Sequence, residues 1–252
     1  MIDKRLATEW IENAGRMALR FFRQTSSWQK ADGSLVTEAD KAVEDYLVNR
    51  IRAQYPHHGI ISEEGTRIQG EEATWVIDPL DGTQAYVMGL PTWCISMGIV
   101  NEEQPVHGIV YLPMTREIIV SWQEETIWND KRIHVPENPR VDADSILCVS
   151  MRTHQAYDFS FPGQILSLGS GIVHNCLVAR GSASGALMLN PCIWDVAAAY
   201  PILQNAGADV YQMDGKPWRW ENRLNDNYRI GPLIACHPRI KKHLLSAIVP
   251  RG

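Results

Sequence analysis

The chain has 252 residues, which is enough for one large domain or two small ones. Its hydrophobic fraction of 45% and charged fraction of 21% are those of an ordinary soluble globular protein. The net charge of −5 gives no reason to expect a nucleic-acid or membrane-surface partner, and no stretch approaches the roughly 18 apolar residues of a membrane span. Residues 1–5 lack the apolar core of a signal peptide, so we expect no secretory signal.

The cysteines are odd in number and never form a C-x-x-C motif; they are Cys94, Cys148, Cys176, Cys192 and Cys236. This pattern favours a reducing cytoplasm and argues against a zinc site or a disulfide framework. Residues 249–252 (Val-Pro-Arg-Gly) are either native or a protease-site scar, and we leave them out of the fold prediction.

The N-terminal part predicts two helices. The first covers residues 3–24 and places its apolar residues on one face, which we expect in the core: Leu6, Trp10, Ala14, Met17 and Phe21. Residues 25–34 are polar and predict a loop or a hairpin. The second helix covers residues 37–54 and buries Val43, Leu47 and Ile51, and Thr37 and Asp40 fit a capping box at its start.

Strand-like runs then follow, separated by turn residues as in an antiparallel meander, at 74–77, 94–100, 106–111, 118–122 and 133–135. Residues 136–144 are polar and contain proline, and they are our candidate boundary between an α+β part (1–140) and an α/β part (141–252). Beyond the boundary we expect strands at 146–149, 210–213 and 233–236, helices at 171–179 and 195–205, and a last helix opened by Pro238.

The most informative motif is Asp78-Pro79-Leu80-Asp81-Gly82-Thr83, which follows the buried strand at 73–77. Carboxylates brought together at a strand end repel each other unless something positive lies between them, and Mg²⁺ prefers such oxygen ligands. Gly82 and Thr83 open a turn or short helix whose N–H groups and hydroxyl suit an anionic oxygen. Glu63 and Glu64 end another apolar run at 59–61. The pattern predicts a metal and phosphate site, although on spacing alone a plain acidic turn fits equally well.

These motifs resemble those of the inositol monophosphatase family, Mg²⁺-dependent phosphomonoesterases that share a superfamily with fructose-1,6-bisphosphatase. The resemblance spans nearly the whole chain and rests on five segments in the family's order: 35–40 (LVTEAD), 63–64 (EE), 75–83 (WVIDPLDGT), 168–170 (LGS) and 194–198 (WDVAA). It implies a layered αβαβα sandwich with a large antiparallel sheet in the first half and a mixed sheet in the second. It also implies an active site between the halves and a homodimer.

The resemblance also implies roles for single residues. The metal ligands would be Glu63, Asp78, the carbonyl of Leu80, Asp81 and Asp195. Thr83, Asp40 and Glu63 would be catalytic, with Thr83 orienting the water that attacks phosphorus and Asp40 holding Thr83. Gly82 and Thr83 would bind phosphate. The substrate would contact Gly169, Ser170, Gly171, Asp195 and the side chain at position 188, which is Met188 here.

Several of these residues also have purely structural interpretations. Asp40 fits a helix cap, Asp195 fits an N-cap, and Ser170 fits the cap of the next helix. Glu64 either supports the metal ligands or faces solvent. Lys30 either contacts the site from a loop that closes near the metals in relatives, or is simply solvated.

The chain departs from the family pattern at three places. Inositol phosphatases usually have a glutamate where Met188 stands, and methionine cannot accept the hydrogen bonds of a polyol, a loss of roughly 1–3 kcal/mol. Residues 84–86 read Gln-Ala-Tyr where Asn-Phe is more common. The segment 151–164 is short, so we expect a more open or differently walled pocket.

We therefore expect a cytoplasmic, Mg²⁺-dependent and lithium-sensitive phosphatase of a small phosphorylated polyol or sugar, with inositol 1-phosphate as the default substrate. It would use metal-activated water and no nucleic-acid or membrane partner. Histidinol phosphate, 3′-phosphoadenosine 5′-phosphate and fructose 1,6-bisphosphate are alternative substrates. A non-catalytic, metal-binding dimeric scaffold is the alternative from a different class of protein.

Overall fold

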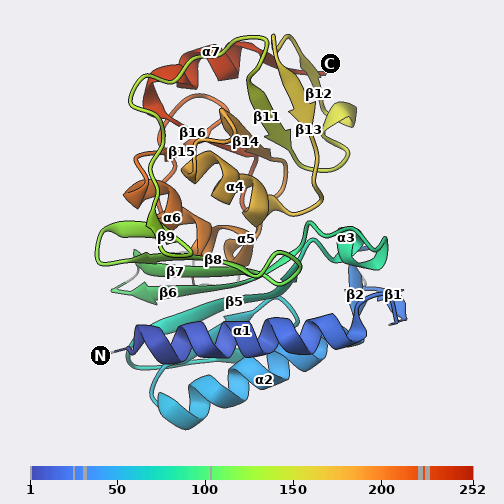
Figure 1. Cartoon of the computed structure of the whole chain (residues 1–252), viewed down its shortest axis with the longest axis vertical. Helices are drawn as coiled ribbons and strands as arrows, with labels where there is room; N and C mark the ends of the chain where they lie inside the picture. The colour runs from blue at the N-terminus through green and yellow to red at the C-terminus, as the bar shows by residue number, and fades with distance from the viewer. Residues whose placement is uncertain are drawn as a thin grey trace.

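The chain folds into five alternating layers of helix and sheet. The computed structural model describes residues 2–24, 26–30, 33–102, 104–220, 224 and 228–251. From one side to the other the layers are a helix pair, an eight-stranded sheet, three helices, a five-stranded sheet and a last helix (Figure 1). The predicted αβαβα sandwich is confirmed. Thr25 and Asp32 of the predicted loop, and Gly252, lie outside the described residues.

The first layer consists of α1 (Lys4–Phe21) and α2 (Glu38–Gln54), packed side by side on the large sheet (Figure 1). Asp3 caps α1 by accepting a hydrogen bond from the N–H of Arg5. The prediction of this helix is confirmed, but its buried face runs through Ile11 and Ala18 as well as Trp10, and Met17 is only half-buried. The predicted capping box of Thr37 and Asp40 is present at the start of α2.

Residues 25–34 were predicted to form a loop or a hairpin, and the described part of this region contributes a strand to an antiparallel pair, as in a hairpin. Strands β1 (Ser27–Gln29) and β2 (Leu35–Thr37) pair antiparallel, and the N–H of Lys30 donates to the carbonyl of Ser34. Lys30 directly follows β1, and its side chain contacts Glu63 in the turn that follows β3 (Gly59–Ser62).

The large sheet has the strand order β10-β9-β8-β7-β6-β5-β3-β4. Its strands are β3, β4 (Arg67–Ile68), β5 (Thr74–Asp81), β6 (Cys94–Asn101), β7 (Gln104–Leu112), β8 (Glu117–Trp122), β9 (Glu125–Trp128) and β10 (Lys131–Arg132). The antiparallel meander is confirmed from β5 to β10, whereas β3 pairs parallel with β5. The predicted strand at 133–135 was wrong. The N–H of Ile133 donates to the carbonyl of Thr126 and that of Val135 to the carbonyl of Ala206, as the chain leaves the sheet.

The smaller sheet is mixed and has the order β13-β11-β14-β16-β15. Its strands are β11 (Ile146–Val149), β13 (Gln164–Leu166), β14 (Gly185–Met188), β15 (Asp209–Gln212) and β16 (Leu233–Cys236). Strands β11, β13 and β14 are parallel, and β15 and β16 join antiparallel. The short strands β12 (Tyr157–Phe159) and β17 (Ile248–Pro250) pair beside it. The proposed boundary near residue 140 falls between β10 and β11.

Between the sheets lie α4 (Gly171–Ala179), which has the predicted bounds, α5 (Ile193–Ala197) and α6 (Ala199–Asn205). The single helix predicted at 195–205 was wrong, because it begins at Ile193 and breaks at Ala198. Pro201 has no N–H to donate to Ala197, and its ring crowds the Ala197 carbonyl, so the helix cannot run through this point. After β16, a 3₁₀ turn at Pro238–Ile240 leads into α7 (Lys241–Ser246).

Close packing fixes α5 against the large sheet. A Cβ atom at Gly98 of β6 would lie 2.6 Å from the Cβ of Ala197, and one at Gly108 of β7 would lie 2.1 Å from the carbonyl oxygen of Ala198. Both distances are too short for real atoms, so glycine is required where the helix meets the sheet. This contact places the start of α5 beside the end of β5.

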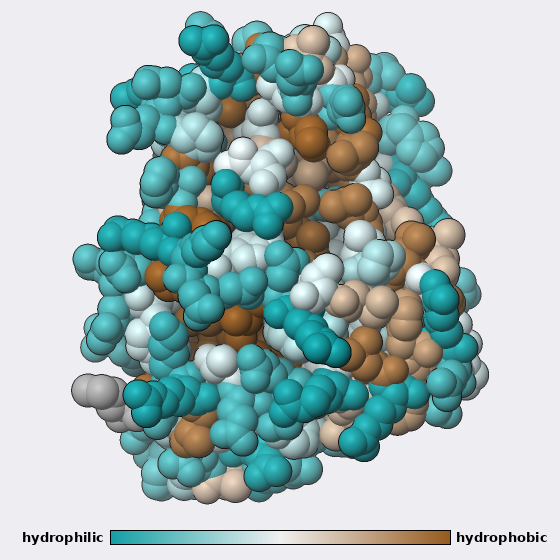
Figure 2. All heavy atoms as spheres, in the orientation of Figure 1, coloured by the Kyte–Doolittle hydropathy of each residue, from teal (hydrophilic) through white to brown (hydrophobic). Residues whose placement is uncertain are grey.

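Apolar side chains fill the spaces between the layers in three separate clusters. On the face seen in Figure 2, hydrophilic residues gather over the bottom layer of α1 and α2, and hydrophobic ones gather mainly higher up and toward α3 (Thr83–Val87). Within the described part of the chain, no helix is both long enough and apolar enough to cross a membrane.

Candidate metal-binding active site

A bulge at the end of β5 turns Asp78 and Asp81 to the same side of the sheet. Asp78 pairs with Ser96 of β6 and Asp81 with Cys94, so β5 has one residue more than its partner between these points. Residues three apart on a regular strand face opposite sides, and the extra residue cancels that alternation. Pro79 has no N–H to donate to the neighbouring strand, and a bulge is a position where proline is tolerated. The N–H of Leu80 donates to Asp78 Oδ1 at 3.1 Å. The local sequence therefore directs both carboxylates to one point.

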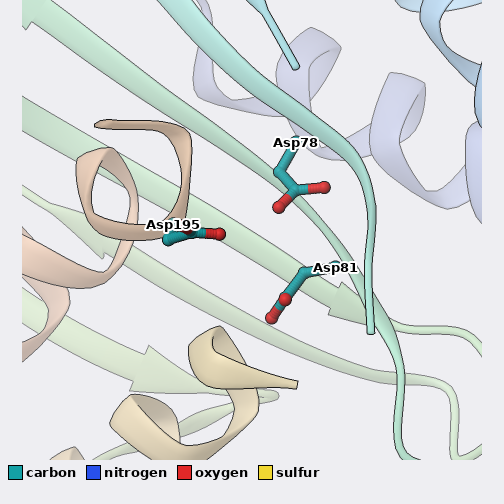
Figure 3. Close-up of side chains that lie close together, drawn as sticks. All are labelled: Asp78, Asp81 and Asp195. Carbon is teal, nitrogen blue, oxygen red and sulfur yellow. The ribbon is translucent and has the colours of Figure 1, made fainter. Parts of the chain in front are cut away.

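Asp195 reaches the same point from the helices between the sheets. It is the third residue of α5 rather than its N-cap, which is Cys192, and its Oδ2 accepts from the N–H of Cys192 at 2.5 Å. One oxygen from each of Asp78, Asp81 and Asp195 lies within 4.8 Å of the others. Figure 3 shows the three side chains close together, Asp78 and Asp81 on β5 and Asp195 on α5.

The start of α4 holds Asp81 in place. Its Oδ2 accepts hydrogen bonds from the hydroxyl of Ser170, which caps α4, and from the N–H of Ile172 at 2.7 Å. The thiol of Cys94 lies 3.9 Å from the same oxygen. Ser170 is fully buried, so its main contact in this structure is with Asp81.

Burial is the largest cause that raises the pKa of each of the three aspartates, and nearby acids add to it. Burial, and then repulsion from Glu63 and from the other two aspartates, raises the pKa of Asp78 well above its usual range. Burial and repulsion from Asp81 and Glu63 do the same for Asp195, and burial raises the pKa of Asp81 to about 6 despite the bonds from Ser170 and Ile172. The ionised forms of these carboxylates are therefore unfavourable unless a cation lies near them.

The donor set fits a hard divalent cation. Asp78 Oδ2 is buried and has no hydrogen-bond partner among the described residues, and no lysine or arginine of that part of the chain forms an ion pair with the three aspartates. Carboxylate oxygens are the ligands that Mg²⁺ prefers. An ion among them would supply both the missing partner of Asp78 and the missing positive charge.

Glu63 and Glu64 lie in the turn after β3, and Lys30 pairs with both. Its Nζ is 3.0 Å from Glu63 Oε1 and 2.6 Å from Glu64 Oε1. Burial alone would lower the pKa of Lys30, but attraction to the two glutamates raises it above its usual range. The Glu64 side chain is only 4% exposed, and burial raises its pKa to about 7, so it is a partner of Lys30 rather than a solvent-facing residue. Glu63 is therefore close enough to the aspartates to repel them, but its ion-pair partner in this structure is Lys30.

Asp40 combines its two predicted roles, one on each oxygen. Oδ2 accepts from the N–H and hydroxyl of Thr37 at 2.8 and 2.6 Å, which completes the cap of α2. Oδ1 accepts from the hydroxyl of Thr83 at 3.2 Å. That hydroxyl also lies 3.0 Å from the carbonyl oxygen of Leu80. Burial raises the pKa of Asp40 to about 6. Gly82 precedes α3 with φ of +90°, a backbone conformation that suits glycine.

Sequence reasoning missed Arg67, which lies at the edge of this cluster. The guanidinium of this β4 residue donates to the carbonyl oxygens of Ser62 and Thr66 and stacks on Trp194 and Tyr228, 5.5 and 4.4 Å from the ring centroids. It thereby connects the Glu63 turn to the first turn of α5. A basic residue shortly after the acidic pair was visible in the sequence, but its aromatic partners are distant in the chain.

A cavity of about 750 Å³ opens beside the aspartates. Of the predicted site residues, it is lined by Glu63, Asp81, Gly82, Thr83, Gly169, Gly171, Met188 and Asp195. Asp40, Asp78, Leu80 and Ser170 lie behind this wall. Met188 is buried, and the amide nitrogen of Asn175 lies 3.2 Å from its sulfur.

Comparison with known proteins agrees with this arrangement. A model of the inositol monophosphatase family matches residues 4–249, and the chain belongs to this family. It is 30% identical to "Nus factor SuhB" of Pasteurella multocida over 97% of this chain and 95% of the relative. It is also 30% identical to "Fructose-1,6-bisphosphatase/inositol-1-monophosphatase" of Aquifex aeolicus, over 75% of this chain and 76% of the relative.

Solved structures share the fold. The extragenic suppressor protein suhB of Bartonella henselae matches with a TM-score of 0.84 at 23% identity, covering 96% of both chains. An IMPase/NADP phosphatase complexed with Mg²⁺ and phosphate matches with 0.83 at 19% identity, covering 96% of this chain and 93% of that one. A staphylococcal inositol monophosphatase-1, in an inhibitory complex soaked with LiCl, matches with 0.84 at 20% identity, covering 96% and 92%.

Proposed function

We propose that this protein is a Mg²⁺-dependent phosphomonoesterase acting on a small phosphorylated polyol or sugar. The observation that carries the proposal is the convergence of Asp78, Asp81 and Asp195 beside an open cavity, with a buried carboxylate oxygen that lacks a partner. Glu63 and the carbonyl of Leu80 would complete the metal ligands. Family membership and a relative's complex with Mg²⁺ and phosphate support the proposal.

When bound, Mg²⁺ supplies Lewis-acid chemistry: it offsets the negative charge of the phosphate and acidifies water. The residues of the chain position the reactants. When the Thr83 hydroxyl donates to Asp40, its lone pairs are free to accept a hydrogen bond from the attacking water and orient it toward phosphorus. Asp40, with a pKa of about 6, is ionised at neutral pH and therefore acts as the acceptor. The N–H groups of Gly82 and Thr83 would hold a phosphate oxygen.

Inositol 1-phosphate is the default substrate, but Met188 argues against tight recognition of its ring. A thioether accepts hydrogen bonds only weakly, so the hydroxyl groups of a bound polyol gain little from this wall. The contacts to Gly169, Gly171 and Asp195 remain available, because all three line the cavity. We expect modest affinity for inositol phosphate.

Phosphate release from inositol 1-phosphate and from a generic ester, with and without Mg²⁺, tests the function. Asp81→Asn removes a proposed ligand while keeping the size of the side chain, and we expect at least a 100-fold loss of kcat. Asp45→Asn, at an exposed position of α2, is the matched control and should retain full activity. Turnover that persists in Asp81→Asn would show that the assigned site is wrong.

A second candidate function follows from the relative named as a Nus factor. In this alternative the protein acts by binding a partner, and hydrolysis is dispensable. The same variant separates the two: a cell that depends on this protein would tolerate Asp81→Asn only if catalysis is not required.

We also propose a cytoplasmic homodimer. The structure shows no disulfide bond among the described cysteines, which suits a reducing compartment. Val87, Met88 and Leu90, in and just after α3, are exposed apolar residues that a partner protomer would cover. Analytical ultracentrifugation of the wild type and of Leu90→Asp tests the oligomeric state.

A further inference from the structure

The cavity joins two different chemical environments. One side carries the acids of the large sheet and α5. The other lies at the carboxyl ends of the parallel strands β11 and β14, where the chain continues into Ser150–Ala156 and Leu189–Pro191. Ligands of mixed sheets commonly bind at such strand ends. At about 750 Å³ the cavity is large enough for a ligand that spans both sides.

Arg152 stands on the second side, and its backbone is held in place. It has φ of +63°, in the left-handed region that residues other than glycine rarely adopt. The turn around it is fixed by bonds from the N–H of Thr153 to Ser150 and from the N–H of Gln155 to Arg152 itself, and Thr153 is buried. Such fixed, unfavourable backbone conformations concentrate at functional sites.

Arg152 lines the cavity, and its exposed side chain has no hydrogen-bond or ion-pair partner among the described residues. Among the described residues that line the cavity, Arg152 is the one arginine or lysine. His174 also lines the cavity, but burial lowers its pKa to about 4, so it is neutral at physiological pH. Lys30, which also lies close to the site, is already paired with Glu63 and Glu64.

The described residues that line this side of the cavity with Arg152 include no carboxylate. They are Ser150, Met151, Gln155, Ala156, Met188, Leu189, Asn190 and Pro191. A guanidinium with five donors and no acceptor nearby is suited to a planar or tetrahedral anion. Met188, which lines the same cavity, offers little to a hydroxyl group, so an ionic contact with Arg152 is the stronger recognition available here.

We propose that the substrate carries a second anionic group, a phosphate or a carboxylate, which Arg152 binds while the scissile phosphate lies at the aspartates. This inference rests on the proposed phosphatase function and narrows its substrate class to bis-anionic esters. Arg152 is then the residue that determines specificity, and the short 151–164 segment is what brings it to the cavity.

Two matched substrate pairs test the inference by kcat/KM: fructose 1,6-bisphosphate against fructose 1-phosphate, and 2-phosphoglycerate against glycerol 2-phosphate. The wild type should prefer the bis-anionic member of at least one pair. Arg152→Gln should lower kcat/KM for that member at least tenfold and change its partner less than twofold, with Arg152→Lys intermediate. Arg52→Gln, at an exposed position of α2, should change nothing. The pair that responds identifies the second anion as phosphate or carboxylate.

Calorimetry with Ca²⁺ in place of Mg²⁺ measures binding of the same compounds apart from turnover. Arg152→Gln should weaken binding of the bis-anionic ligand at least tenfold and leave the mono-anionic ligand unchanged. Equal effects on both members of each pair, or no effect in either assay, would overturn the inference while Mg²⁺-dependent hydrolysis of the simple esters left the proposed function intact. Absence of hydrolysis for all four esters would overturn the inference, and absence of hydrolysis of inositol 1-phosphate as well would overturn the proposed function.

Discussion

Ser170 donates a hydrogen bond to Oδ2 of Asp81, although the two residues belong to different layers of the fold. The same hydroxyl oxygen accepts from the N–H of Val173 at 3.0 Å and so caps α4. One side chain therefore orders both a helix start and a proposed metal ligand. This contact joins the large sheet to the helices that carry the smaller sheet.

Ser170→Ala should lower the free energy of unfolding by about 1–2 kcal/mol, since it removes an N-cap and a bond to a buried carboxylate. It should also weaken Mg²⁺ binding, because Asp81 loses an orienting donor. Urea denaturation with and without Mg²⁺ measures both effects. Ser246→Ala, which removes only an exposed hydroxyl that donates to His243, is the control and should stay within a few tenths of a kcal/mol.

Arg67→Ala should raise the Mg²⁺ concentration for half-maximal activity several-fold, because the Glu63 turn and α5 lose their connection through Trp194 and Tyr228. Arg67→Lys keeps the charge but not the flat stacking surface, so it should recover only part of the affinity. A purely structural role would instead lower the melting temperature and leave the Mg²⁺ dependence of the folded enzyme unchanged.

Lys30→Gln should destabilise the metal-free protein by about 1–3 kcal/mol, because Glu63 and the buried Glu64 lose their counter-ion. Added Mg²⁺ should restore much of this loss by taking over as the cation beside Glu63. The rise in melting temperature on adding Mg²⁺ should therefore be larger in Lys30→Gln than in the wild type. An equal rise in both proteins would show that Lys30 and the metal do not share Glu63; Lys242→Gln, at an exposed position, controls for net charge.

His174 should make the protein less stable in acid. Burial lowers its pKa from the ordinary 6.5 to about 4, and its Nε2 accepts from the N–H of Leu168 at 2.9 Å. In the unfolded chain His174 is protonated below about pH 6.5, whereas in the folded protein it stays neutral down to about pH 4. Stability is therefore full above pH 6.5 and falls through this window by up to about 3 kcal/mol.

His174→Gln keeps an acceptor for Leu168 and cannot be protonated, so it should remove this part of the acid sensitivity between pH 7 and pH 4.5. Urea denaturation at several pH values measures the difference. His243→Gln, at an exposed position, should follow the wild type. Parallel curves for His174→Gln and the wild type would contradict the assignment.

Lithium should inhibit the proposed hydrolysis at millimolar concentrations. The cluster of three carboxylates offers Li⁺ a position that Mg²⁺ would otherwise take. Inhibition should weaken as Mg²⁺ is raised. Activity unchanged by tens of millimolar Li⁺ at low Mg²⁺ would argue against a shared position.

Local signals in the sequence were enough to predict most of the elements. The capping box of Thr37 and Asp40 fixed the start of α2, and alternating apolar residues located β5 to β8 and β11. The division of the helix at Ala198 was not predicted, because the apolar pattern continues through it, although Pro201 disfavours the helical turn that precedes it. Short edge strands such as β12 and β13 carry no pattern strong enough to recognise, since pairing with distant segments creates them.

The site was less predictable than the fold. Asp78 and Asp81 lie three positions apart in the sequence, but their side chains face the same side of the sheet because of a bulge opposite Cys94 and Ser96. The contacts of Arg67 and Lys30 join segments that only the folded chain brings together. Sequence spacing cannot encode such distances, and the family resemblance supplied the pairing of Asp195 with the first-half acids.

The most direct test of the account is a crystal structure of the protein with Mn²⁺, located by its anomalous scattering. We expect one Mn²⁺ ion in direct contact, at about 2.0–2.3 Å, with oxygens of Asp78, Asp81 and Asp195. Ordered, ion-free carboxylates at saturating Mn²⁺, or a structure in which Asp195 lies apart from the other two, would contradict it.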